Sequence, residues 1–132
     1  MREVLPCSVI PMLLGNNRCS RRLARRLFLR LNLRSVIFDT FSSGELDLMI
    51  SAAFSPIPMT SNDEFILLGL EKFAAENDDM TCLLVPCSDW FVEFTDRYRQ
   101  RLDERFIIRL PAEVERATRV GSKMPYARKG IS

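Results

Sequence analysis

The sequence predicts an α/β domain with a mostly parallel sheet of four to five strands. Residues 8–14 and 81–85 are continuous apolar runs, which are typical of strands buried on both faces, as the strands of parallel sheets are. Segments with the apolar spacing of amphipathic helices follow both runs. Strands that alternate with helices indicate parallel strands joined by helical crossovers.

The first strand and the first helix are joined by a short polar turn. The strand at residues 8–14 ends at Gly15, and Asn16 and Asn17 are expected to supply a turn and a helix N-cap. Across residues 18–31 the apolar side chains fall on one side of a helix and three arginines fall opposite. This segment is therefore expected to pack on the sheet as an amphipathic helix.

Two further strands are expected before the middle of the chain. Residues 35–38 form a short apolar run with Asp39 at its end. Residues 52–57 are expected to form an edge strand. Pro56 and Pro58 have no backbone N–H to donate to a neighbouring strand, which confines such a segment to the edge of a sheet.

The second half of the chain continues the alternation. The expected elements are a helix from a capping box at residues 61–64 to about residue 76, a strand at 81–85, a helix after Ser88 and Asp89, a short strand at 106–110, and a helix and tail from 111 onward.

Composition and residue types exclude several classes of protein. The 132 residues fit one domain, and 47% hydrophobic with 27% charged residues is ordinary globular composition. Without histidine there is no Ser-His or Cys-His pair, and the four cysteines form no CxxC pair for zinc. The cysteines are expected to be buried thiols in a reducing compartment, so the expected location is cytoplasmic, with no membrane partner. A net charge of +2 does not by itself indicate a nucleic-acid partner.

The candidate ligand site lies where the predicted strands end, because open parallel sheets bind ligands beyond the carboxyl ends of their strands. This rule points to residues 15–18, 39–43 and 87–90, although Asp39 could also simply end its strand. The loop after the first strand combines a helix start with an arginine, which suits an anion, but one glycine is not the dinucleotide pattern GxGxxG. Each feature also has a purely structural interpretation. The loop after the first strand could be only a tight turn, Ser88 and Asp89 only a helix cap, and Trp90 only a cover over the edge of the core. The candidate cleft residues are Gly15, Asn16, Asn17, Arg18, Ser88, Asp89 and Trp90.

Three segments together resemble the pre-ATP-grasp domain of ATP-grasp carboxylate–amine ligases, such as D-aspartate ligase and carbamoyl-phosphate-synthase-like proteins. They are VIPMLLGNNRCSRRLARRL at residues 9–27, CLLVPCSDWFVEF at 82–94 and FIIRLP at 106–111. Against the family patterns PxLLGSDxNxYxxAR and CGDxYVEL, the matching residues are Gly15, Ala24, Arg25, Cys87, Asp89, Val92 and Glu93. The resemblance implies a three-layer, Rossmann-like domain over residues 1–110.

Residues 120–131, VGSKMPYARKGI, are similar to the start of the ATP-grasp module itself, in which Lys123 would approach the nucleotide phosphates. The resemblance therefore implies that residues 111–132 are a helix and tail leading toward a module that this chain lacks. In the parent ligase, ATP and Mg²⁺ would activate a carboxylate as an acyl phosphate before an amine attacks. This chain would form part of the substrate or nucleotide cleft, would contain no catalytic residue, and would need the missing lobes in cis or from a partner chain.

A second hypothesis makes the chain an independent binding module. The exposed side of the first predicted helix, with Arg18, Arg22 and Arg25, could hold nucleic acid or an acidic protein, or it could be only a solvated helix surface. Leu29 lies in the middle of that side and suits a protein contact better than phosphate, so nucleic acid is the less favoured partner. A homodimer is also left open.

Overall fold

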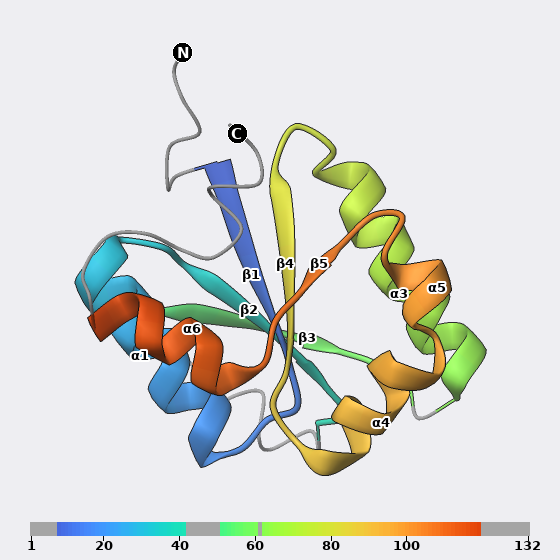
Figure 1. The fold of residues 1–132 in the computed structure, drawn as a ribbon, viewed down its shortest axis with the longest axis horizontal. Helices are drawn as coiled ribbons and strands as arrows, with labels where there is room; N and C mark the ends of the chain where they lie inside the picture. The colour runs from blue at the N-terminus through green and yellow to red at the C-terminus, as the bar shows by residue number, and fades with distance from the viewer. Residues whose placement is uncertain (1–7, 42–50, 61, 120–132) are drawn as a thin grey trace.

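The predicted α/β class is confirmed by the computed structural model, which describes residues 8–41, 51–60 and 62–119 (Figure 1). Every described strand pairing is parallel, and the strand order is β3-β2-β1-β4-β5. The elements are β1 (Val9–Leu14), α1 (Arg18–Leu31), β2 (Ser35–Asp39), β3 (Phe54–Pro58), α3 (Asp63–Glu76), β4 (Thr81–Pro86), α4 (Asp89–Arg97), α5 (Arg99–Leu102), β5 (Ile107–Ile108) and α6 (Pro111–Arg119).

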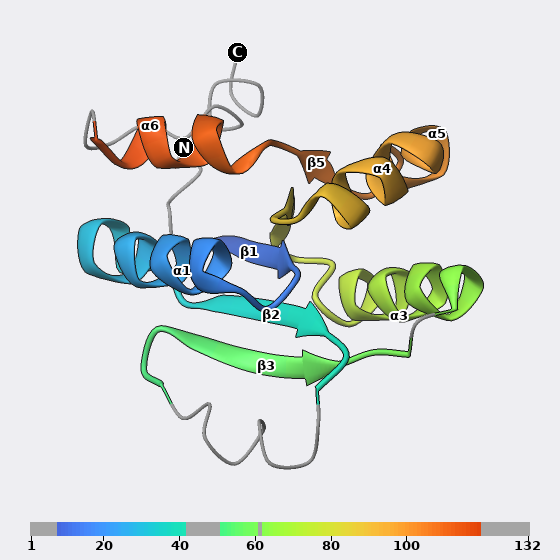
Figure 2. The ribbon, with the colours of Figure 1, turned by 90° about the horizontal axis from the view of Figure 1, so that it is seen from below.

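The sheet is the middle of three layers, as in Rossmann-like folds. Helices α1 and α6 cover one face, and α3, α4 and α5 cover the other (Figure 2). Each face has its own apolar cluster: Leu13, Leu27 and Ile37 belong to the cluster under α1, whereas Leu14 and Phe94 belong to the one under α3 and α4. Successive residues of β1 thus point into opposite layers, which explains why its sequence is apolar throughout.

Strand positions follow the apolar pattern of the sequence. β1 and β4, the two continuous apolar runs, pair over six residues at the centre of the sheet. β3 carries both prolines, Pro56 and Pro58, and is one of the two edge strands of the described sheet, as predicted. The last strand is shorter than the expected 106–110, because only Ile107 and Ile108 pair with β4.

The expected capping box at residues 61–64 is wrong by one position. Asn62 is the N-cap of α3, and its side-chain oxygen accepts hydrogen bonds from the backbone N–H groups of Glu64 and Phe65 at 3.0 and 3.2 Å. With the cap at Asn62, the third helical residue is Phe65, which has no carboxylate to return a bond. Glu64 instead lies 3.5 Å from Arg101; Ser61 lies outside the described residues.

Helix α6 packs in the same layer as α1. Its Val114 and Ala117 are buried in the apolar cluster that also contains Leu23 and Leu27 of α1. Across the two helices, Arg26 lies 3.9 Å from Glu115, and Arg30 donates to the Thr118 carbonyl at 3.4 Å. The described part of the predicted segment 111–132 therefore covers the sheet, while the expected domain division at residue 110 stays a prediction.

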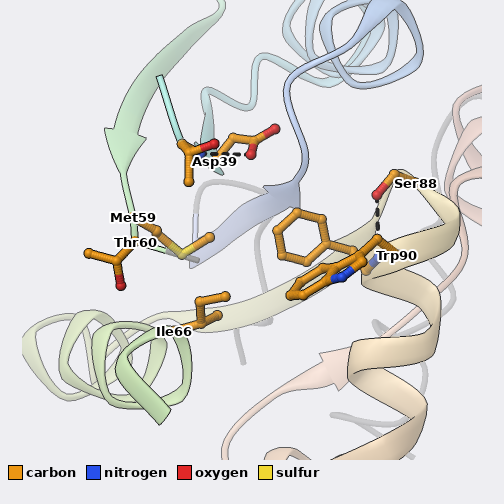
Figure 3. Close-up of a pocket in the computed structure, with 8 residues that line it drawn as sticks. Asp39, Met59, Thr60, Ile66, Ser88 and Trp90 are labelled. Carbon is orange, nitrogen blue, oxygen red and sulfur yellow. Dashed lines mark hydrogen bonds between the residues drawn. The ribbon is translucent and has the colours of Figure 1, made fainter. Parts of the chain in front are cut away.

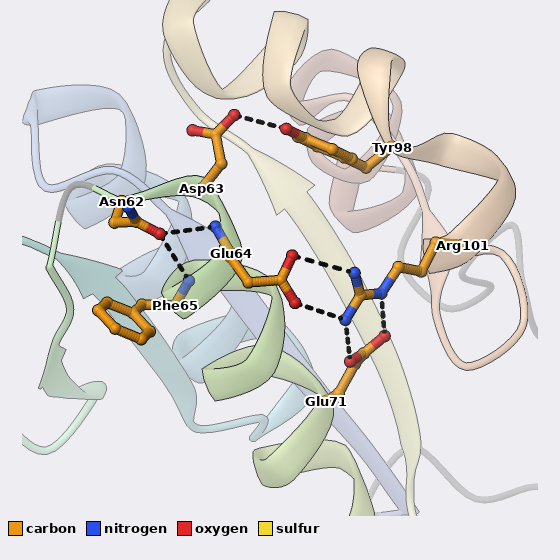
Figure 4. Close-up of polar contacts among 7 residues, drawn as sticks. All are labelled: Asn62, Asp63, Glu64, Phe65, Glu71, Tyr98 and Arg101. Carbon is orange, nitrogen blue, oxygen red and sulfur yellow. Dashed lines mark hydrogen bonds and ion pairs between the residues drawn. The ribbon is translucent and has the colours of Figure 1, made fainter.

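An ion-pair network fastens α3 to α4 and α5 (Figure 4). The Arg101 guanidinium donates two hydrogen bonds of 2.8 Å to the Glu71 carboxylate, and Tyr98 donates to Asp63 at 2.7 Å. Hydrogen bonds from Arg101 lower the pKa of Glu71 below its ordinary value of 4.5, against the opposing effect of burial. The bidentate geometry makes the Arg101–Glu71 pair a strong, directional contact between α3 and α5.

We expect the Glu71→Gln variant to lose stability at neutral pH and to lose less in acid. A carboxylate with a lowered folded-state pKa contributes stability above its unfolded pKa, near 4.5, and that contribution disappears as the pH falls through the lowered value. At pH 7 the melting temperature should fall by roughly one to four degrees. Thermal melts between pH 7 and pH 3.5 test this, with Glu76→Gln as the control because Glu76 lies 3.9 Å from an exposed Lys72. An equal loss at both ends of this range would contradict the assignment.

Candidate functional site

A pocket of about 220 Å³ lies beyond the carboxyl ends of β2, β3 and β4, where ligands of open parallel sheets bind. Figure 3 shows Asp39, Met59 and Thr60 on one side of it, and Ser88 and Trp90 on the other. We call it the strand-end pocket; its lining residues are Asp39, Thr40, Met59, Thr60, Ile66, Ser88, Trp90 and Phe91. Its volume is below the range of about 300–1,000 Å³ typical of cofactor and drug-sized ligands, so it fits a small molecule.

Aromatic side chains fix one wall of the strand-end pocket. The Trp90 ring stacks on Phe94, with centroids 5.6 Å apart and ring planes 13° apart, and meets the edge of Phe91 at 4.9 Å. Phe91 and Phe94 are buried, so Trp90 is held by the core although 46% of its surface is exposed. A large, oriented apolar surface is thus available to a ligand.

Asp39 supplies the charge of the pocket. One carboxylate oxygen accepts a hydrogen bond from the backbone N–H of Asn16, and the other accepts from the backbone N–H of Thr40 at 2.7 Å. Each carboxylate oxygen can accept more than one bond, so both oxygens keep capacity for a further donor. Asp39 is the single charged residue among the lining residues, which gives this part of the molecule a preference for hydrogen-bond donors and cations.

The turn after β1 borders the pocket and is fixed to the turn after β4. Asn17 caps α1: its side-chain oxygen accepts from the Ser20 N–H at 2.9 Å, while Ser20 Oγ accepts from the Asn17 N–H at 3.0 Å. The Asn17 side-chain amide also donates to the Cys87 carbonyl at 3.0 Å. The predicted turn and N-cap are therefore confirmed, and both helix starts are held at one place on the sheet edge.

The structure brings together some of the predicted cleft residues. Ser88 and Trp90 line the pocket, and Gly15 lies beside it, since a Cβ there would be 3.5 Å from Phe91 and 3.6 Å from Ser88 Oγ. Ser88 is also the N-cap of α4, accepting from the Phe91 N–H at 3.3 Å. Asp89, the first residue of α4, is exposed.

The other predicted residues lie outside the pocket lining. Asn16 and Asn17 use their polar groups within the turn, where Asn16 accepts from Arg21 at 2.7 Å. Arg18 is exposed at the start of α1, and Lys123 lies outside the described residues. Four lining residues were not predicted to belong to the site: Met59, Thr60, Ile66 and Phe91. None of them carries a sequence signal for a pocket. The strand-end rule pointed to Asp39 but could not give it a role.

The buried Cys87, next to the pocket residue Ser88, is not an activated nucleophile. Burial raises the pKa of the Cys87 thiol well above its usual range, and the Cys19 thiol raises it further, so Cys87 stays protonated. In the described ranges, no three His, Cys, Asp or Glu side chains come close enough together to hold a metal ion. None of the described helices is long and apolar enough to cross a membrane.

The fold and the pocket define an α/β protein with a small cavity at the carboxyl edge of its sheet. The chain matches no protein-family model, no curated protein and no solved structure.

We expect Gly15→Ala to destabilise the fold by about 1–2 kcal/mol, because Gly15 has φ +108°, which side chains with a Cβ rarely adopt. The new Cβ would meet its neighbours at ordinary contact distances, so backbone strain is the cause of the loss. The same change at Gly69, in α3 with nothing within 4 Å, should stabilise by about 0.5–1 kcal/mol. Urea unfolding measures the unfolding free energy of both variants. A Gly15→Ala protein as stable as the wild type would contradict the predicted backbone strain.

Two substitutions of Asn17 distinguish its role as the N-cap of α1 from its hydrogen bond to the Cys87 carbonyl. Asn17→Ala removes the cap and the bond to Cys87, and should cost about 1–2 kcal/mol of unfolding free energy. Asn17→Asp keeps a capping oxygen and loses only the amide donor, so it should retain most of the stability. Urea titrations of the two variants give the comparison. If Asn17→Asp is as unstable as Asn17→Ala, the contact between the two turns matters more than the cap.

Proposed function

We propose that this chain is the substrate-cleft domain of an ATP-dependent carboxylate–amine ligase of the ATP-grasp type. The segments at residues 9–27 and 82–94 support the ligase family by their resemblance. The three-layer fold is compatible with such a domain but is shared by many other functions. The observation that carries the proposal is the strand-end pocket, which both resembling segments border through Gly15, Ser88 and Trp90.

We assign the amine-bearing substrate of that reaction to the strand-end pocket. Asp39 presents carboxylate oxygens that can accept hydrogen bonds from an ammonium group. Met59, Ile66 and the Trp90 ring offer apolar contacts for the rest of a small molecule. A carboxylate placed in the same pocket would meet Asp39 as a like charge, so the amine is the better match.

ATP and Mg²⁺ do not fit the described residues of this chain. The pocket is smaller than typical cofactor sites, and no three His, Cys, Asp or Glu side chains of the described ranges are placed to hold a metal ion. In this proposal both belong to ATP-grasp lobes supplied in cis or by a partner chain, and Lys123 would approach the phosphates there. The chain's own contribution is to bind and orient the substrate.

The same proposal includes a cytoplasmic location. Cys19, Cys82 and Cys87 are free thiols, and the last two are buried. Buried unpaired cysteines suit a reducing compartment, where no oxidant converts them to disulfides.

Trp90 is the only tryptophan in the chain, so its fluorescence reports directly on the strand-end pocket. We expect a saturable change in Trp90 emission with at least one small amino acid or amine, and a much weaker change with the matched acid that lacks the amino group. Thr60→Phe, which fills the exposed rim of the pocket, should abolish the response, whereas Thr60→Ser should preserve it. Binding that is unaffected by Thr60→Phe would place the site elsewhere.

Calorimetric titration with Mg-ATP tests the incomplete nucleotide site. The purified chain should give no saturable heat, because in this proposal the nucleotide contacts belong to lobes outside residues 1–132. Saturable micromolar binding that is lost on substitution of Gly15 or Lys123 would mean that the domain holds nucleotide unaided, and it would contradict the proposal.

A further inference from the structure

Helix α1 concentrates positive charge on the layer of the molecule opposite to the strand-end pocket. Its sequence, RCSRRLARRLFLRL, contains six arginines and no acidic residue. Arg18, Arg22, Arg25 and Leu29 are exposed and follow one another at helical spacings of four, three and four residues. We call these four residues the α1 outer face; they extend over ~16 Å of the helix.

The arginines of α1 divide into two groups by their contacts. Arg21, Arg26 and Arg30 contact Asn16, Glu115 and Thr118, and so serve the turn after β1 and the packing of α6. Within the described residues, the three arginines of the α1 outer face make neither hydrogen bonds nor ion pairs. Like charges at these spacings destabilise a helix. These three arginines therefore add no stability that neutral polar side chains would lack.

The surface around these arginines is hollowed and contains one exposed apolar side chain. A shallow depression of about 270 Å³ lies along the helix, and its lining residues are Arg22, Arg25, Arg26, Leu29 and Arg30. Leu29 is 78% exposed, the largest exposure of any large apolar side chain in the described ranges. A partner that covers this surface must therefore neutralise arginines and cover a leucine at the same time.

We propose that the α1 outer face docks an acidic protein segment, whose carboxylates pair with Arg18, Arg22 and Arg25 and whose apolar side chain covers Leu29. Carboxylates match the guanidinium groups in charge and in hydrogen-bonding geometry. A phosphate backbone would match the charge but would leave Leu29 against a charged chain, so a protein segment fits the combination better. The α1 outer face shares no residue with the lining of the strand-end pocket, so this inference does not rest on the proposed ligase function.

A fluorescence-anisotropy titration tests the docking surface. The probe is a short labelled peptide that places three glutamates and one leucine along one helix face, and the comparison probes are oligoglutamate and a single-stranded oligonucleotide of equal charge. The acidic peptide should bind at low salt, more tightly than either comparison probe, and more weakly as salt rises. An oligonucleotide that binds as tightly as the peptide, or a peptide that fails to bind at low salt, overturns the proposal.

Matched charge reversals locate the binding. Arg22→Glu/Arg25→Glu should weaken peptide binding by about tenfold or more, since two charge-assisted contacts are lost. Arg99→Glu/Arg105→Glu, on the opposite layer, changes the net charge equally and should leave most of the affinity. Leu29→Ser should weaken the acidic peptide but not oligoglutamate. If both double variants lose peptide affinity equally, the effect is due to net charge alone, and the assignment of binding to the α1 outer face is overturned.

Folding and self-association have their own readouts. Circular dichroism and thermal melting verify that each variant is folded, and the milder pair Arg22→Gln/Arg25→Gln repeats the test without new acidic side chains. Light scattering gives the mass of each protein in solution. A wild-type dimer that Arg22→Glu/Arg25→Glu dissociates would make the α1 outer face a contact between copies of this chain, which overturns an acidic partner.

Discussion

The parallel pairing of β1 with β4 is the constraint on which the rest of the structure depends. It joins residues that lie about seventy positions apart in the chain and runs for six residues, from Val9 opposite Thr81 to Leu14 opposite Pro86. The ladder continues into the turns, where the Cys87 N–H donates to the Leu14 carbonyl at 2.9 Å. Because both strands end together, the starts of α1 and α4 must lie side by side, and the pocket is formed next to them.

Asp39 combines a structural role with a role in the pocket. Its carboxylate holds the backbone of Asn16 and Thr40, so the turn after β1 and the end of β2 share one acceptor. The same oxygens give the strand-end pocket its negative charge. A carboxylate fixed in this way is preorganised for a ligand, since no side-chain rotamer must be ordered when the ligand binds.

The two layers of helices present different chemistry to the solvent. The layer with α3 and α4 carries the pocket and is fastened by paired charges, among them Arg101 with Glu71. The layer with α1 and α6 carries the exposed Leu29 beside Arg22 and Arg25, which have no ion-pair partner within the described ranges. A small ligand and an acidic protein segment would therefore occupy separate surfaces of the domain, without competing for the same residues.

The sequence by itself determined the elements whose signals are local. The continuous apolar runs marked the two central strands, the period of α1 gave both of its ends, and Pro56 and Pro58 assigned β3 to an edge. The sequence also predicted that Gly15, Ser88 and Trp90 lie at one edge of the sheet, because the carboxyl ends of parallel strands share an edge. These results need only side-chain periodicity and backbone chemistry.

Only the tertiary structure decided which polar groups meet. Asn62 rather than Ser61 caps α3, and Glu64 turns to Arg101 on another helix, a partner that no local pattern can specify. Met59, Thr60 and Ile66 line the pocket only because the end of β3 and the start of α3 lie opposite α4. A polar side chain can bond to several neighbours in the sequence or to one distant residue, and the packing of the helices decides between them. These contacts therefore could not be predicted from the sequence.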